Sequence, residues 1–269
     1  SFLENYIHTL KKKTLSYSEE STVKTILKSW LDSMDGTTSE SKTSYKCKYC
    51  NKSFAKESTL TAHACEQKRR AQQETETGVQ FGFRAYLRFY ELTQGSAKFK
   101  SYDDFRQSPY YTAFVKFGRW CVNIRCINTP AFTDWLLKNN KKLDYWCSDS
   151  LYEEWLRPYL QKEATQDALE RALKEMQSYA DDHPELKNGF VDYFRYGNVN
   201  RVIHHITTGR ISPWVVYNSA TGVEFLDSLT EDQVALVLPW IDPDVWQHKF
   251  KDYMGDTEWV KDVLKVAGL

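Results

Sequence analysis

The sequence predicts a mainly α-helical protein with one small unit of two short strands and a helix near the N-terminus, and at most one further short β-hairpin. Three observations predict this fold. Apolar residues recur at helical spacing over most of the chain, helix start signals precede many of these stripes, and a short cysteine and histidine pattern interrupts them. The 269 residues are 41% hydrophobic and 15% aromatic, which is enough for a substantial core.

Residues 1–36 are predicted to form an N-terminal helical arm of two short helices. Apolar residues recur at helical spacing in both, and Ser16 with Glu19 gives a capping-box signature at the start of the second helix. Gly36 ends that helix, and residues 37–44 are a polar linker. The apolar stripes indicate packing against the main body or against another subunit.

The segment from 45 to 65, YKCKYCNKSFAKESTLTAHAC, contains the spacing C-x2-C-x3-F-x5-L-x2-H. Cys47 and Cys50 would lie on a tight knuckle, and His63 would project from the helix that follows. Phe54 would serve as an apolar plug beside the metal, together with Leu60. No histidine or cysteine follows His63 at the usual spacing of three to five residues, so Cys65 is predicted to be the fourth ligand.

This pattern predicts a ββα zinc finger with one tightly held structural zinc ion that has no open coordination position. The finger resembles the two-Cys, two-His type but has a cysteine as its last ligand. The alternative is that Cys47 and Cys50 are reduced thiols in a polar loop. Residues 45–77 are predicted to form the finger with a basic helical extension, because its helix is expected to continue until Gly78 breaks it.

The remaining residues, 78–269, are predicted to form an aromatic-rich α-helical domain. Its stripes include one between Val79 and Tyr90, one between Tyr110 and Ile124, and one between Leu169 and Ala180. The helix start signals that accompany the stripes of this domain are Ser108-Pro109, Thr129-Pro130, Thr165, Thr230 with Gln233, and Asp242-Pro243. Only residues 211–218 have strand character, and they are expected to pair with residues 223–226 in a short hairpin.

Charge is distributed unevenly along a chain whose 36 basic and 36 acidic residues cancel. Eight basic and two acidic residues lie between Lys42 and Arg70, a local balance of +6 that leaves −6 for the rest. A basic finger on an acidic body favours a DNA or RNA backbone as partner, although a solvated basic face is the alternative. The residues predicted to contact phosphates are Lys46, Lys48, Lys52, Lys56, Lys68, Arg69 and Arg70.

Sequence-specific reading by this finger is not expected. If its helix entered a major groove in the usual way, Lys56, Thr59 and Ala62 would face the bases, and such a set distinguishes few of them. A single finger also covers only about three base pairs.

The other cysteines, Cys121, Cys126 and Cys147, are interpreted as buried thiols because their surroundings are aromatic and apolar. With no signal peptide and no apolar run of membrane-spanning length, the sequence predicts a soluble protein of a reducing compartment without a membrane partner.

An enzyme is not expected. His204 and His205 are adjacent, so on a helix they would point about 100° apart and would not chelate one ion. The carboxylates between Asp144 and Glu154 lack a partnering histidine, and no phosphate loop or nucleophile elbow is present. No small-molecule substrate is expected either.

The stretches TLTAHACEQKRR, SPYYTAFVKFGRWC, TDWLLKNN, GRISPWVVYN and IDPDVWQHKFKDY resemble an uncharacterised zinc-finger protein of T-even-like tailed phages, including those of marine cyanobacteria. This resemblance implies a place in the host bacterial cytoplasm or in the virion, and it implies no activity.

Two function classes remain open at this stage. The first is a nucleic-acid-binding accessory protein whose finger grips phosphates while the helical body engages a protein partner. The second is a structural or assembly protein, such as a virion component, in which zinc staples a segment too small to fold alone and the finger mediates protein contact.

Overall fold

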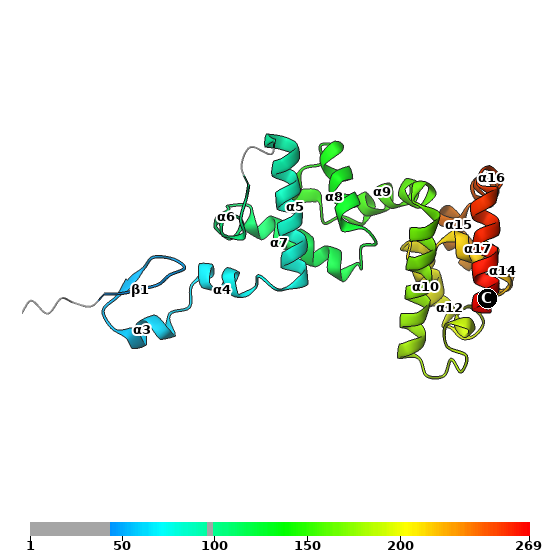
Figure 1. The fold of residues 1–269 in the computed structure, drawn as a ribbon, viewed down its shortest axis with the longest axis horizontal. Helices are drawn as coiled ribbons and strands as arrows, with labels where there is room; N and C mark the ends of the chain where they lie inside the picture. The colour runs from blue at the N-terminus through cyan, green and yellow to red at the C-terminus, as the bar shows by residue number, and fades with distance from the viewer. Residues whose placement is uncertain (1–43, 96–98) are drawn as a thin grey trace, which may run out of the picture. The chain divides into compact units, whose positions relative to one another are not determined.

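The computed structural model describes residues 44–95 and 99–269, and they are helical almost throughout apart from one two-stranded antiparallel hairpin (Figure 1). The predicted mainly α fold is confirmed. The predicted N-terminal arm, residues 1–36, and the linker that follows it lie outside the described residues. By the density of its internal contacts the chain divides into two compact units, residues 1–68 and 69–269.

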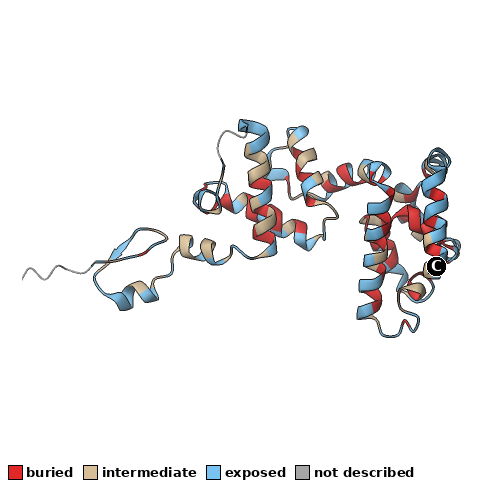
Figure 2. Cartoon of the chain, in the orientation of Figure 1, coloured by how far each residue is buried: buried red, intermediate tan, exposed pale blue. Residues whose placement is uncertain are grey.

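The described part of the first unit is a small ββα module. Strand β1 (Tyr45–Lys46) pairs with β2 (Ser53–Phe54), with Tyr45 opposite Phe54, and helix α3 (Glu57–Ala62) follows. Of its residues only Cys47 is buried, so a hydrophobic core contributes little here (Figure 2). Such a module needs another source of stability, and a bound metal is the usual one.

Three residues separate the end of α3 from the start of helix α4 (Glu66–Gln72), so the expected continuous helix from the finger to Gly78 is wrong. Gly78 breaks nothing, since it lies buried near the start of α5 (Thr77–Gln94). There it allows α7 (Tyr111–Asn123) to approach closely: a Cβ built on Gly118 of α7 would lie 2.0 Å from the Gly78 carbonyl oxygen. Glycine is required at this crossing because no side chain fits between the two backbones.

Two hydrophobic clusters stabilise the second unit. The first is aromatic and comes mainly from α5 to α9, with Trp146 fully buried against Phe114 and Phe117. The elements of this part are α5 and α7 as given, α6 (Tyr102–Gln107), α8 (Thr129–Lys138), the 3₁₀ turn η1 (Leu143–Tyr145) and α9 (Asp149–Lys162).

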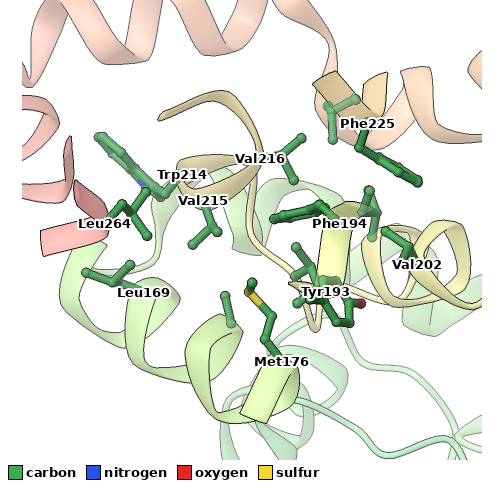
Figure 3. Close-up of a cluster of buried hydrophobic side chains, with 14 of the residues drawn as sticks. Leu169, Met176, Tyr193, Phe194, Val202, Trp214, Val215, Val216, Phe225 and Leu264 are labelled. Atoms are coloured by element: carbon green, nitrogen blue, oxygen red, sulfur yellow. The ribbon is translucent and has the colours of Figure 1, made fainter. Parts of the chain in front are cut away.

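The second cluster comes from the helices after α9. Side chains of α10, α11, α13 and α17 converge around Trp214 and Met176, both fully buried (Figure 3). The elements are α10 (Thr165–Asp182), η2 (Gly189–Asp192), α11 (Tyr193–Tyr196), α12 (Val199–Thr207), α13 (Pro213–Asn218), α14 (Ala220–Asp227), α15 (Glu231–Ile241), α16 (Pro243–Asp252) and α17 (Met254–Ala267).

The hairpin expected between residues 211 and 227 is wrong, because both of its strands are helices. The Ser212 side chain accepts the Trp214 N–H and Pro213 occupies the first helical position, which together start α13. Ser219, expected in the turn, caps α14 by accepting the Gly222 N–H. The valines of residues 211–218 resemble a strand, but an apolar run buried on all sides has no periodicity that separates strand from helix.

Candidate metal centre

Four predicted ligands converge in the first unit. One ligand atom from each of Cys47, Cys50, His63 and Cys65 lies within 4.8 Å of every other, and no other cluster of this kind occurs within residues 44–95 and 99–269. The Cys50 Sγ and the His63 Nε2 are 3.3 Å apart. In a tetrahedral site with metal–sulfur bonds of about 2.3 Å, neighbouring sulfurs lie about 3.8 Å apart, so the cluster has the dimensions of a single-ion site.

Cys47 and Cys50 are positioned by a tight knuckle between the strands. The Cys47 N–H donates to the Lys52 carbonyl at 2.9 Å, and the Asn51 N–H donates to the Cys47 carbonyl at 2.8 Å. Asn51 takes a φ of 61°, a left-handed conformation that asparagine tolerates better than most residues. The backbone N–H groups of Cys50 and Tyr49 point at the Cys47 sulfur and lower the pKa of that thiol, which favours the thiolate that a metal binds.

His63 and Cys65 reach the same site because α3 stops between Ala62 and His63. Residues two apart on an α-helix point about 200° apart, whereas in extended backbone they point to the same side. His63 is the C-terminal cap of α3 and has extended dihedral angles, φ −68° and ψ 113°. The prediction that His63 projects from the helix is therefore wrong by one residue, and the short His-x-Cys spacing explains why α3 and α4 are separate.

Around these ligands, Phe54 and Leu60 are half-buried, as expected of the two plugs. The Phe54 ring packs on the His63 imidazole with centroids 4.6 Å apart, which restricts the orientation of that ligand. Cys65 has a second contact, since its Sγ accepts the Lys68 N–H at 3.4 Å. Cys65 thus occupies the N-cap position of α4.

The residues predicted to contact phosphates fall into two groups. Four lysines of the first unit are exposed: Lys46, Lys48, Lys52 and Lys56. Lys68 is half-buried and Arg69 is exposed.

Arg70 is occupied by contacts within the second unit. Its guanidinium lies over the Tyr111 ring, 4.4 Å from the centroid, and its Nη1 donates to the Arg106 carbonyl at 2.8 Å. The Tyr102 hydroxyl donates to the Arg70 carbonyl at 2.6 Å. These contacts give Arg70 a structural role that its place in a basic run did not reveal.

Of the weaker sequence candidates, Asp149, Glu153 and His204 line one cavity of about 390 Å³. His205 is buried, and its Nδ1 is hydrogen-bonded to the Tyr193 hydroxyl at 2.7 Å, while burial lowers the pKa of His205 to about 3. It is a core histidine, as expected. Asp144 and Asp149 are exposed, and Glu153 pairs with Arg157 on its own helix.

No helix of the described residues is long and apolar enough to cross a membrane. Comparisons of the chain with protein-family models, with curated proteins and with solved structures give no match.

Proposed function

We propose that residues 44–68 form a structural zinc site within a non-enzymatic protein. Three sulfurs and one imidazole nitrogen are a donor set that zinc prefers, and four protein ligands fill a tetrahedral site completely. Water then has no coordination position, so the ion would hold the module together without activating a nucleophile. The near absence of buried apolar residues in this module supports the same role.

The second part of the proposal is that the zinc module binds the phosphate backbone of DNA or RNA. The observation that carries it is the exposure of Lys46, Lys48, Lys52 and Lys56 on a module too small to scatter them widely. Exposed ammonium groups held close together neutralise successive phosphates and release their counterions. Acidic residues are few nearby, with Glu57 and Glu66 alone between Lys42 and Arg70.

Binding would be largely independent of sequence. Helix α3 has six residues, of which Thr59 and Ala62 would have to read bases if the helix entered a groove. Neither side chain makes the bidentate contacts that discriminate base pairs. Lys56, which precedes the helix as its N-cap, would give at most a small preference for guanine.

The helical body would engage a protein partner. Large apolar side chains stay exposed on α15 and α17, for example Leu236 and Met254 with exposed fractions of 60% and 68%. Patches of this kind are common at protein interfaces. The phage context expected from the sequence resemblance stays a prediction.

The second candidate function is a zinc-stapled structural or assembly protein. The contacts of Arg70 with Tyr111 and the Arg106 carbonyl favour it, because part of the basic segment serves the fold instead of a ligand. In this case the zinc module would mediate protein contact, and its lysines would only keep it soluble.

Salt-dependent DNA binding distinguishes the two candidate functions. Fluorescence anisotropy with a duplex of arbitrary sequence should give an affinity that falls as salt rises, with a log–log slope on the order of −3 to −5. A variant with Lys46, Lys48, Lys52 and Lys56 changed to alanine should flatten that slope by up to about three units.

The matched control removes four exposed lysines from the body: Lys138, Lys187, Lys251 and Lys265. It has the same change in net charge, so it should leave the slope unchanged if the zinc module is the contact surface. If the protein does not bind DNA at low salt, or if both variants lose the same DNA affinity, the zinc module does not bind phosphates. The structural or assembly role is then the function that remains.

A further inference from the structure

Helix α7 ends in a turn that brings two cysteines together. The Cys126 N–H donates to the Cys121 carbonyl at 2.9 Å, and the Arg125 N–H donates to the Val122 carbonyl at 3.1 Å. Arg125 has a φ of 52°. These are the two hydrogen bonds and the left-handed residue of a Schellman motif, in which the side chains at the first and sixth positions pack together. Here both of those side chains are cysteines, and both are free thiols.

The surroundings of Cys126 favour its thiolate. The neighbouring Cys121 thiol has the largest effect on the Cys126 thiol, and the Thr129 hydroxyl, the Asn128 backbone N–H and the Tyr152 hydroxyl add to this effect. Together they lower the pKa of Cys126, against the opposing effect of burial. The pKa of Cys121 is raised well above the ordinary value, first because of its interaction with Cys126 and then because it is buried.

Cys126 is also accessible from one side. It lines a cavity of about 660 Å³ between α5 and the start of α8, together with apolar groups of Phe81, Leu87, Ile127 and Pro130. Cys121, in contrast, is 1% exposed. A reagent that enters the cavity would therefore meet Cys126 before the buried Cys121.

We propose that Cys121 and Cys126 are a thiol pair that small, uncharged organic disulfides convert reversibly into an intramolecular disulfide. The Cys126 thiolate attacks one sulfur of the reagent and releases one thiolate, which leaves a mixed disulfide on Cys126. That step removes the negative charge that held the proton on the Cys121 thiol. Cys121 then loses this proton and attacks the Cys126 sulfur, which releases the second thiolate. The thiol pair loses two electrons and one proton. The reagent gains the electrons as two thiolates, which become two thiols by taking up that proton and one from water.

Peptide mapping of the full chain tests this directly, because trypsin separates the three cysteines of the second unit. Cleavage after Arg119, Arg125, Lys138 and Lys142 places Cys121 in 120–125, Cys126 in 126–138 and Cys147 in a third peptide. The protein is incubated with bis(2-hydroxyethyl) disulfide, quenched with N-ethylmaleimide and digested without reductant. The expected product is 120–125 joined to 126–138, with a mass two hydrogens below their sum, and a reductant should separate them.

Two variants sharpen the result. The Cys147→Ser variant should form the same linked peptide to the same extent. The Cys121→Ala variant should instead keep Cys126 as a mixed disulfide with one half of the reagent. If Cys126 of the unaltered protein carries only N-ethylmaleimide, remains a mixed disulfide, or leaves Cys121 to join Cys147, the thiol pair does not exist.

Discussion

Cys65 has two roles at the residue scale, since its sulfur is a predicted zinc ligand and also accepts the Lys68 N–H at the start of α4. Serine cannot replace it, because a hydroxyl is a poor ligand for zinc. The Cys65→Ser variant should bind zinc on the order of 100-fold more weakly. This loss corresponds to about a quarter of the zinc-binding free energy that is typical of such sites. Competition with a chromophoric chelator measures this.

The matched control is Cys147→Ser, which removes a thiol from the second unit and should leave zinc affinity unchanged. Equal affinities for the Cys65 variant and the unaltered protein would show that Cys65 is not a ligand.

His205 gives the second prediction at this scale, and it concerns acid. Its Nε2 lies 3.5 Å from Glu175, but Arg125 already makes a bidentate pair with that carboxylate. Burial, followed by the positive charge of Arg210, lowers the pKa of His205 to about 3 from its ordinary value of 6.5. Below pH 6.5 the unfolded chain therefore binds a proton that the folded chain does not.

The free energy of unfolding should consequently fall as pH drops from about 6.5 toward 3, by up to about 1.4 kcal/mol per pH unit from this group. Urea titrations at several pH values would measure it. The His205→Gln variant should show a shallower pH dependence, while a control at exposed His248 should keep the original slope. An unaltered slope for His205→Gln would mean that His205 does not carry the effect.

At the scale of elements, the crossing of α5 and α7 depends on glycine. A Cβ on Gly118 would lie 2.0 Å from the Gly78 carbonyl oxygen and 2.4 Å from the Gly82 nitrogen, and neither backbone atom can move without its helix. Gly118→Ala should lower the free energy of unfolding by about 3 kcal/mol. Gly255 of α17 has no atom within 4 Å of the corresponding position, so Gly255→Ala should be neutral or stabilising by up to about 1 kcal/mol.

Thermal or urea unfolding of the Gly118→Ala and Gly255→Ala variants measures both changes in the free energy of unfolding. Similar stabilities for the two would contradict the close helix crossing. These glycines also show why the prediction for Gly78 was wrong. From a single sequence, a glycine that ends a helix cannot be distinguished from a glycine that allows a neighbouring helix to approach closely. Only the packing of α7 against α5 distinguishes them.

Local signals predicted some helix starts well, but Ser108 and Pro109 are not the cap and first residue of α7, which begins at Tyr111 with Tyr110 as its N-cap. Thr230 and Gln233 form the expected capping box of α15, and Asp242 with Pro243 starts α16 as expected. Residues 211–218 were predicted wrongly because their β-branched residues suggested a strand, and the helix start at Ser212 and Pro213 was missed. The cluster of Cys47, Cys50, His63 and Cys65 was predictable because the spacing of these residues along the chain matches a known metal-binding pattern.

At the scale of the whole molecule, the sequence did not predict how the second unit is organised. Its helices pack into two hydrophobic clusters, and the partly buried Trp240 contacts both. This division depends on contacts distant in sequence, such as the Thr165 hydroxyl that donates to Asp256 at 2.7 Å. The exposed apolar residues of α15 and α17 would, in our proposal, meet a protein partner while the zinc module holds a nucleic acid.

The central claim is that the module is built on zinc held by Cys47, Cys50, His63 and Cys65. Zinc K-edge X-ray absorption of the purified protein tests it most directly, because the spectrum reports both the metal and its ligands. We predict one zinc per chain with three sulfur ligands at about 2.3 Å and one nitrogen ligand at about 2.0 Å. Protein that retains no zinc, or a spectrum of oxygen and nitrogen ligands without sulfur, would contradict the account.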